Sequence, residues 1–528
     1  MTFLKHKRSV DDIWPMRHKR VLVRVDFNVE VKNGVISRSK DQRIAAAIPT
    51  IRRITEQGGI CILMSHMGRP TGHKYNVLKN DSAKRQRYLN IWKDENGAGY
   101  TVFFSLLNGE TKKKILGWSS AAESAADLSE DGGAGKTDIF ASLCNEEKKL
   151  LLTRFQNTNH NHNTTFPHLR QYDGFNDELT LLPVAARLYD LLNSSELHPP
   201  VDVHFAGDCM NAGHIVNSLQ PGQVLLLENL RFYSDENSSK QSERVAMAQQ
   251  LASYCDYFVS DAFGTIHRIN SATTVELPAI IGHGCCGYLL KKEIEAYSKL
   301  LDVTPRPMLA IIGGAKVADK ISLLENLLRR IDTLIIGGAI AYTFLRVAGY
   351  EIANSFAEAG QSFIDKYGEK RDIEELAQNF LIKAKACNVQ VLLPIDHVCH
   401  TSCEATNTPL ITETAHIPKD YMGLDIGPRT IELFRKCISQ SRSVVWNGPM
   451  GVYEIPIYAT GSFSIAKELG DRTQEGLLSI ISGGASADAA RMCGHASRVC
   501  HVSSGGAASL DLLQAKVLPG IDALDDLE

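Results

Sequence analysis

The sequence predicts an α/β protein made of two doubly wound parallel-sheet domains, each Rossmann-like, which a hinge helix joins. Near its start, an apolar strand opens at 20–23, "QRIAAAIPTIRRITEQGG" has helical periodicity, and "ICILMSHMGRP" begins as a second strand. Strand, helix and strand in that order form a βαβ unit and hence a parallel sheet. The same rhythm returns in "MLAIIGGAKVADKISLLENLLRRIDTLIIGG". A chain of 528 residues is also too long for one hydrophobic core.

The domain boundaries follow from this rhythm. We predict an N-terminal domain over 1–290, a hinge helix over 291–305 and a C-terminal domain over 306–500. The last segment, 501–528, is expected to return to the first domain. "KKEIEAYSKLLDV" supplies the hinge helix, and the prolines of "TPRP" end it. Residues 76–178 are polar and rich in Asn, Ser and Gly, so we expect a partly disordered insertion on the first domain.

Composition narrows the classes of function. The chain has 44% hydrophobic and 22% charged residues with a formal net charge of −3, so no global field draws it to nucleic acid or to an anionic membrane. We expect no nucleic-acid partner and no transmembrane segment, because no apolar run reaches membrane-spanning length. The 12 cysteines lack framework spacing, which suggests reduced thiols in an intracellular protein.

Polar side chains in the first half follow the ends of predicted strands. Asp26, Asn28, His66 and Arg69 all lie just past such ends, at the sheet edge where open parallel sheets bind ligands. Guanidinium groups bind carboxylate and phosphate bidentately. A single arginine would be read as a solvated surface residue, but several at the same kind of junction predict a site for a small polyanion. The arginines concerned are Arg24, Arg43, Arg69, Arg231 and Arg268, with His66 and His267 beside them.

The second half favours a nucleotide. In "GGAKVADK", Lys316 and Lys320 lie four apart in the first turns of a predicted helix, where lysine opposes the helix dipole unless an anion such as a triphosphate is bound. Glycines also recur at successive strand ends, where they allow a backbone to approach a ligand closely. One glycine pair is weak evidence because tight turns need glycine anyway, but the repetition is stronger. These turns are Gly337-Gly338, Asn447-Gly448-Pro449, Gly483-Gly484 and Gly505-Gly506.

Two other motifs are set aside. "EDGGAGKT" (130–137) is similar to a Walker A loop, but Glu130 stands in the place of the first glycine and no strand precedes it. "HVCHTSC" (397–403) has thiol and imidazole groups, yet its spacing matches no familiar zinc framework. We predict neither a phosphate loop nor a zinc site from them.

At this point the motifs resemble those of one family, the phosphoglycerate kinases. They occur in the family's order and cover nearly the whole chain outside the insertion. The resemblance implies reversible phosphoryl transfer between ATP, with Mg²⁺, and 3-phosphoglycerate, giving ADP and 1,3-bisphosphoglycerate in glycolysis and gluconeogenesis. It also implies a monomer that closes about its hinge. The motifs are "RVDFNV", "SHMGRP", "LLLENLRF", "SDAFGTIHR", "IIGGAKVADKI", "MGLDIGP", "VVWNGPMGVYE" and "AKVLPG".

The resemblance also assigns roles to residues of the first domain. Asp26 and Asn28 would contact the acid's hydroxyl and carboxyl end, and Arg43 would reach the carboxyl group and the transferring phosphoryl. The non-reacting phosphate and its neighbouring oxygens would be bound by His66, Arg69, Arg231 and Arg268, with Arg24 in the same site.

In the second domain, Lys316 would track the transferring phosphoryl and Lys320 would neutralise nucleotide phosphates. Glu454 would hold the ribose hydroxyls. The glycines taken as catalytic are Gly484 and Gly506. The remaining nucleotide-binding residues would be Gly314, Gly338, Leu424, Asn447, Pro449, Gly483, Gly484 and Ser486.

One loop departs from the family's pattern. Where the family reads "GGGDT" or "GGGDS", this chain has "SGGAS", so Ala485 replaces the aspartate that the family uses for nucleotide-bound magnesium. Asp319 is our first candidate to take over part of that role, and Asp488 the second. The alternative is a catalytically impaired relative that binds nucleotide or phosphoglycerate as a regulatory or scaffold protein. Intact Arg43, Lys316, Lys320 and Glu454 favour the enzyme.

The predicted insertion bears on the cellular compartment of the protein. Some phosphoglycerate kinases of kinetoplastid glycosomes are similar in carrying an insertion in the N-terminal domain. The resemblance therefore leaves two compartments open for this chain, cytoplasmic and glycosomal.

Overall fold

The computed structural model describes residues 7–31, 36, 41–70, 179–194, 197–302, 304–318, 320–358, 360–364, 370–404, 407–514 and 516–527. The predicted insertion and Asp319 lie outside these residues. The chain divides into two compact units, His6–Lys291 with Pro519–Glu528, and Lys292–Leu518. We call them the N-terminal unit and the C-terminal unit. No helix in the described ranges is long and apolar enough to cross a membrane.

The N-terminal unit is built on a six-stranded parallel sheet. Its central strand, "RVLVRV", has valines on one face, and side chains on both faces are buried along nearly its whole length, which is typical of a strand covered by helices on both sides. The strand order is β3-β4-β2-β1-β5-β6. The strands are β1 (Arg20–Val25), β2 (Ile60–Met64), β3 (Val203–Ala206), β4 (Val224–Leu227), β5 (Tyr257–Asp261) and β6 (Gly284–Cys286).

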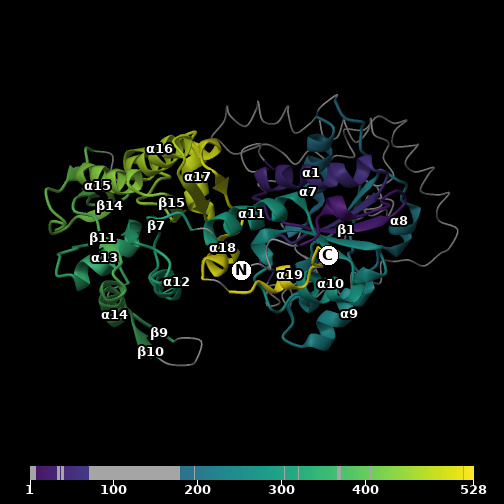
Figure 1. Ribbon diagram of the computed structural model, residues 1–528, viewed down its shortest axis with the longest axis horizontal. Coiled ribbons are helices and arrows are strands. Elements are labelled where there is room, and N and C mark those ends of the chain that lie inside the picture. Colours follow the sequence, from purple (N-terminus) through teal and green to yellow (C-terminus); the bar gives the residue numbers. More distant parts are fainter. Residues whose placement is uncertain are drawn as a thin grey trace, which may run out of the picture. The chain divides into compact units, whose positions relative to one another are not determined.

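Helices cover both faces of this sheet. Figure 1 shows α1 and α7 on one side of β1 and α9 and α10 on the other. Val21 and Val23 of β1, Ile44 and Ile51 of α1 and Leu188 of α7 are fully buried in one apolar cluster. The helices are α1 (Gln42–Glu56), α7 (Leu182–Leu192), α8 (Gly213–Ser218), α9 (Gln241–Ala252), α10 (Leu277–Ile281) and α19 (Pro519–Asp522), with short turns η5 (Leu230–Phe232), η6 (Ser234–Asn237) and η8 (Ala272–Glu276).

The C-terminal unit repeats the plan. A second six-stranded parallel sheet has the order β11-β8-β7-β15-β16-β17. Its strands are β7 (Met308–Ile312), β8 (Thr333–Ile336), β11 (Gln390–Leu392), β15 (Ser443–Asn447), β16 (Leu478–Ser482) and β17 (His501–Val502). The helices are α12 (Ile321–Leu327), α13 (Gly338–Val347), α14 (Ile373–Ala386), α15 (Pro428–Ser439), α16 (Thr460–Gln474), α17 (Gly484–Met492) and α18 (Gly506–Leu513). Two parallel sheets with helices confirm the predicted α/β class.

Two small antiparallel sheets accompany the second parallel sheet, and the sequence did not predict them. One pairs β9 (Ser362–Ile364) with β10 (Lys370–Asp372). The other has the order β13-β12-β14 and joins β12 (His397–His400), β13 (Leu410–Ile411) and β14 (Met422–Ile426). The "HVCH" part of the motif set aside as a zinc site is therefore strand β12.

The boundaries differ in detail from the expected ones. Helix α11 (Tyr288–Asp302) runs through the division, which falls between Lys291 and Lys292. The segment that belongs to the N-terminal unit begins at Pro519 and not at 501, because β17 pairs with β16 and extends the second sheet. After Pro519 the chain forms backbone hydrogen bonds with the N-terminal unit: Gly520 N–H donates to the Ile266 carbonyl at 2.9 Å.

Candidate functional site

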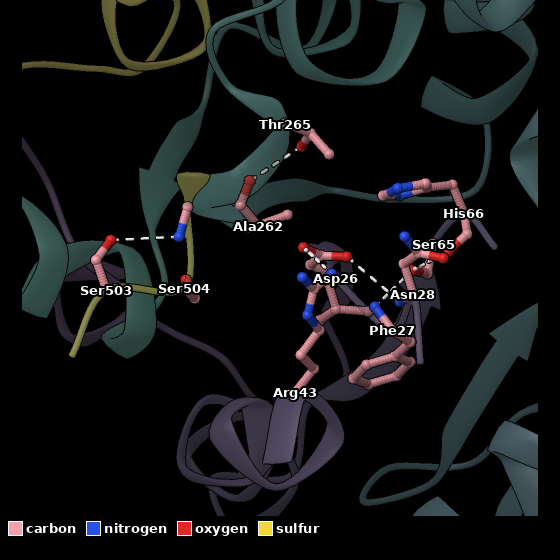
Figure 2. A network of polar contacts seen from close by, with 12 residues as sticks. Asp26, Phe27, Asn28, Arg43, Ser65, His66, Ala262, Thr265, Ser503 and Ser504 are labelled. Atoms are coloured by element: carbon pink, nitrogen blue, oxygen red, sulfur yellow. Dashed lines mark hydrogen bonds and ion pairs between the residues drawn. The ribbon is translucent and has the colours of Figure 1, made fainter. Parts of the chain in front are cut away.

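The predicted acid-binding residues lie where strands of the first sheet end. Asp26 follows β1, His66 lies two residues past β2, and Arg231 lies in the turn after β4. Because the carboxyl ends of parallel strands meet at one edge, these side chains come from neighbouring junctions. Figure 2 shows Asp26, Asn28, Arg43 and His66 in one such region, with Arg43 reaching from α1 toward Asp26.

Hydrogen bonds tie the first two junctions together. Arg43 Nη1 lies 3.0 Å from Asp26 Oδ2 and forms an ion pair. Gly68 N–H donates to Asn28 Oδ1 at 2.9 Å, and Phe27 N–H donates to Ser65 Oγ at 2.9 Å. The loop 65–70 after β2 is therefore held against the loop after β1, and Asp26, Asn28 and Arg43 are fixed around it.

Arg24 is the last residue but one of β1. Its side chain is buried, and its guanidinium donates to Thr273 Oγ1 and to His66 Nδ1, each at 3.2 Å. Burial lowers the pKa of Arg24, and the nearby carboxylates of Glu236 and Asp26 oppose that shift. Glu236 in turn accepts from Thr273 Oγ1 at 2.7 Å. Arg24 is thus placed to orient His66.

His66 is held as a neutral imidazole. Burial, followed by the positive charges of Arg24, Arg231, Arg268 and Arg43, lowers its pKa well below the ordinary value. Since Nδ1 accepts a hydrogen bond from Arg24, the ring proton is carried by Nε2. His66 can therefore donate one hydrogen bond to an anion without needing to be protonated.

The arginines form one cationic cluster. The pKa of Arg231 falls to about 10, first through burial and then through Arg268 and Arg24, with a smaller contribution from Arg69. Its guanidinium donates to the Gly68 carbonyl. Arg268 Nη1 donates to Asn237 Oδ1 at 3.3 Å, while its buried Nε has no partner among the described residues. Like charges held this close repel one another, so the cluster favours a polyanionic ligand.

The nucleotide loops of the C-terminal unit are tied backbone to backbone. Gly313 N–H donates to the Asn447 carbonyl at 2.9 Å, and Gly314 N–H donates to the Pro449 carbonyl at 3.0 Å. Gly338 has a φ of +61°, and a Cβ there would lie 2.7 Å from both Gly314 N and the Pro449 carbonyl oxygen. Only glycine fits that position, so the three strand ends pack closely against one another there.

The two lysines of this region have different surroundings. Lys320 Nζ donates to the Gly313 carbonyl at 2.5 Å, whereas Lys316 is exposed. The backbone between them is fixed by Glu358, whose Oε2 accepts from the N–H groups of Val317 and, at 3.0 Å, Ala318. Lys316 is therefore an exposed charge on an anchored loop.

The loop 482–486 is shaped by hydroxyl groups. Ser486 is fully buried; its Oγ accepts from Gly448 N–H at 2.7 Å and donates to the Ser482 carbonyl at 2.9 Å. Its hydroxyl therefore bonds within the protein and holds this loop to the one after β15. Gly483 has a φ of +89°, and Gly484, exposed, begins α17 as Gly506 begins α18. Both helices present backbone N–H groups at their first turns.

The remaining predicted contacts lie in the same unit. Leu424 is buried in β14, Asn447 ends β15 with its Nδ2 donating to the Ser482 carbonyl at 3.2 Å, and Glu454 is exposed. Asp425, beside Leu424, accepts from Gly461 N–H at 2.6 Å. Burial raises the pKa of Asp425 to about 7.

The described residues near Ala485 do not fit a magnesium site of the protein's own. Ala485 packs against the apolar core of the unit. Asp488, one turn further on, has 48% of its side chain exposed and pairs with Arg491 at 2.6 Å. No group of three or more His, Cys, Asp or Glu side chains within the described ranges could hold a metal ion. Asp319, the first candidate, lies outside those ranges.

Sequence reasoning missed four buried residues that fix the loops. Asn229 and Glu228 follow β4, Glu236 lies in η6, and Glu358 lies between α13 and β9. The signal available was a polar residue directly after an apolar strand, as in "LLLENLRF", where only the arginine was singled out.

The comparisons with known proteins agree on one family. A family model described as phosphoglycerate kinase matches residues 10–93 and 154–516. Phosphoglycerate kinase A of Trypanosoma brucei brucei is 49% identical over 523 residues, 99% of this chain and 97% of the relative. A glycosomal phosphoglycerate kinase of Trypanosoma congolense is 49% identical over 526 residues (99% and 98%), and a cytosolic one of the same organism is 43% identical over 524 (99% of each chain).

A solved structure adds to this. The phosphoglycerate kinase of Coxiella burnetii superposes with a TM-score of 0.65 at 28% identity, covering 98% of each chain. The similarity thus extends over both units.

Proposed function

This chain belongs to the phosphoglycerate kinase family, and from that premise we propose how its residues carry out phosphoryl transfer to a carboxyl group. The substrates are ATP and 3-phosphoglycerate, and the products are ADP and 1,3-bisphosphoglycerate. The observation that carries the proposal is the cationic cluster around His66, with Arg24, Arg231 and Arg268 held close at strand ends. Such a cluster suits a small acid bearing both a carboxylate and a phosphate.

The N-terminal unit binds the acid in this account. The neutral Nε2–H of His66 and the guanidinium groups of Arg69, Arg231 and Arg268 hold the phosphate that does not react. Asp26 and Asn28 contact the hydroxyl and carboxyl end. Arg43, now paired with Asp26 at 3.0 Å, exchanges part of that contact for the substrate carboxylate and the moving phosphoryl.

The C-terminal unit binds the nucleotide. Lys320 neutralises charge on its phosphates, the N–H groups of Gly483 and Gly484 donate to them, and Lys316 follows the transferring phosphoryl. Gly314, whose N–H bonds to the Pro449 carbonyl, contributes by letting the phosphates approach the backbone closely. Gly506 supplies a further N–H group.

The nucleoside lies beside Gly338, where a Cβ would clash with neighbouring backbone. Leu424, Asn447 and Pro449 also contact it, and exposed Glu454 holds the ribose hydroxyls. Ser486 supports this region through the bond of its hydroxyl to Gly448, and its backbone N–H, in the first turn of α17, is our proposed nucleotide contact.

No general base is required, because the substrate carboxylate is already a nucleophile. The transition state spreads negative charge over the equatorial oxygens of the phosphoryl group, so catalysis consists of alignment and charge stabilisation. A hinge movement at α11, which runs through the division between the units, would bring the two ligands together and exclude water.

Magnesium accompanies the nucleotide in this proposal. Mg²⁺ keeps several waters and is held largely by substrate phosphates, so a missing protein carboxylate weakens its binding without necessarily abolishing it. Ala485 supplies no carboxylate and Asp488 is paired with Arg491, so the substrate phosphates would be the main ligands of the ion.

The second candidate function is a binder that no longer catalyses transfer. Ala485 favours it, since the family's aspartate is missing from this loop. As to location, relatives are named both glycosomal and cytosolic, and we place this chain in one of those two compartments as a monomer.

Calorimetry with each ligand separately tests the proposal. We expect Arg231→Ala to weaken 3-phosphoglycerate binding at least tenfold and leave ADP binding unchanged, while Lys320→Ala does the reverse. An enzyme should bind ADP more tightly when Mg²⁺ is added, whereas equal ADP affinity without the metal would favour the binder. Loss of both ligands in both variants would contradict the division of roles.

A further inference from the structure

Asn229 is a buried residue to which the proposed function gives no role. It follows β4 directly and is fully buried. Its Oδ1 accepts from Met67 N–H and from Arg231 N–H, each at 3.1 Å. Its Nδ2 donates to the Met67 carbonyl at 2.9 Å and to the Leu179 carbonyl at 3.0 Å. All four hydrogen-bonding directions of one amide are used.

Those partners lie beside the acid-binding side chains. Met67 lies between His66 and Arg69, and the second partner is Arg231 itself. Leu230 N–H adds a bond to the Ser65 carbonyl at 3.0 Å. One side chain therefore fixes the spacing between the loop after β2 and the turn after β4, which between them carry three of the anion-binding groups.

Glu228 supports Asn229 from behind. It is 1% exposed, and its Oε1 accepts from Asn229 N–H at 2.7 Å and from Leu181 N–H at 2.8 Å. Its Oε2 accepts from Thr180 Oγ1 at 2.6 Å. Residues 179–181, where the described chain resumes after residue 70, are thereby hydrogen-bonded to Glu228 and Asn229.

We propose that Asn229, oriented by Glu228, is a positioning residue for the substrate phosphate: it holds His66, Arg69 and Arg231 at the spacing that phosphate binding requires. The inference rests on the proposed function, because it takes 3-phosphoglycerate as the ligand. Asn229 acts through these side chains and does not touch the substrate.

A pair of asparagine variants tests the role. Asn229→Asp keeps the acceptor oxygen but replaces the two donors by an oxygen facing the Met67 and Leu179 carbonyls. Asn193 is the matched control: its Nδ2 donates to the Tyr189 carbonyl at 2.8 Å and the Val201 carbonyl at 3.0 Å, and its Oδ1 accepts from Val201 N–H. It lies in the same unit and makes a similar set of bonds away from the acid site.

We expect Asn229→Asp to raise KM for 3-phosphoglycerate about tenfold, with KM for ATP changed less than twofold and kcat within about threefold. Asn193→Asp should lower Tm by a similar amount without moving either KM. Glu228→Gln, which keeps its shape and an acceptor oxygen, should raise the same KM less than threefold. A lowered Tm in Asn229→Asp with unchanged KM for 3-phosphoglycerate would overturn the proposal, as would an equal KM change in Asn193→Asp.

Two further measurements keep the test decisive. If Asn229→Asp does not fold, hydrogen exchange is measured on the natural protein instead. The amides of Met67 and Arg231 should exchange slowly, and more slowly still when 3-phosphoglycerate is added. Fast exchange that does not respond to the ligand would overturn the proposal. If the natural protein shows no turnover, the proposed function fails, but calorimetric titration with 3-phosphoglycerate still reports whether Asn229→Asp weakens binding relative to Asn193→Asp.

Discussion

The two proposed anion sites are built differently. The N-terminal site uses side-chain charge: Arg24, Arg43, Arg231 and Arg268 surround a neutral His66. The C-terminal site uses backbone: glycine turns at three strand ends donate to one another's carbonyls around Gly338. One substitution removes one side-chain charge, whereas a site made of backbone groups loses its binding when a substitution changes the shape of the backbone. The two sites should therefore respond to different substitutions.

The largest effect is expected from removing a charge of the first site. Arg43→Ala leaves Asp26 without its 3.0 Å partner and removes a cation from the moving phosphoryl. We expect kcat to fall by about 10²–10³, the range for losing one donor to a developing negative charge. Arg53→Ala is the control, since Arg53 lies on the same helix and pairs with Asp11. A kcat within threefold of the natural protein in Arg43→Ala would contradict its role.

A methyl group should damage the second site. In Gly338→Ala the Cβ would lie 2.7 Å from two backbone atoms, so the loops after β7 and β15 must move. We expect KM for ATP to rise tenfold or more and the free energy of unfolding to fall by about 2 kcal/mol. Gly476→Ala separates strain from crowding, because Gly476 also has a positive φ of +102° but no atom within 4 Å of its Cβ. It should lose about 1 kcal/mol with KM unchanged.

His66 gives the first site an acid-sensitive stability. Its folded pKa lies well below the ordinary 6.5, so between these values the unfolded chain binds a proton that the folded protein does not. This contribution to stability is present above pH 6.5 and is lost as pH falls, by up to about 1.4 kcal/mol per pH unit. Denaturant unfolding at pH 7 and pH 5 should show a smaller loss in His66→Gln than in the natural protein. An equal loss in both would show that His66 titrates normally.

The smallest effect concerns Asp425 in the second site. Its contribution to stability changes with pH in the opposite direction to that of His66. Its folded pKa of about 7 lies above the ordinary 3.8, so the folded protein holds a proton that the unfolded chain releases. The contribution is present below pH 4 and is lost as pH rises through 7. Asp425→Asn, which keeps an acceptor for Gly461 N–H, should remove about 1 kcal/mol of this fall between pH 5 and pH 7. An unchanged slope would mean that Asp425 is ionised in the folded protein.

Local patterns were sufficient to predict the strands and turns that carry these sites. The apolar run of β1 and the glycines at 313–314 and 337–338 each depend on neighbours in sequence, and the structure has them at strand ends. The structure also brings the predicted arginines together, because parallel strands end at one edge.

What the sequence did not predict depends on distant partners. Asn229 bonds to Met67, 162 residues away, and Glu358 bonds to Val317, 41 residues away. The hydroxyl of Ser486 accepts from Gly448, 38 residues away, while the predicted contact of Ser486 with the nucleotide stays a prediction. Likewise β17 joins the second sheet through pairing with β16, which no local pattern in so short a strand could indicate.

The central claim is that a phosphoryl-transfer site remains active without the family's aspartate at position 485. Its most direct test is steady-state turnover of the purified protein with 3-phosphoglycerate and ATP, coupled to NADH consumption and titrated with Mg²⁺, beside Ala485→Asp. We predict turnover by the natural protein with a raised Mg²⁺ requirement that the variant lowers. No turnover by the natural protein, with activity recovered in Ala485→Asp, would contradict the claim and identify this chain as a binder.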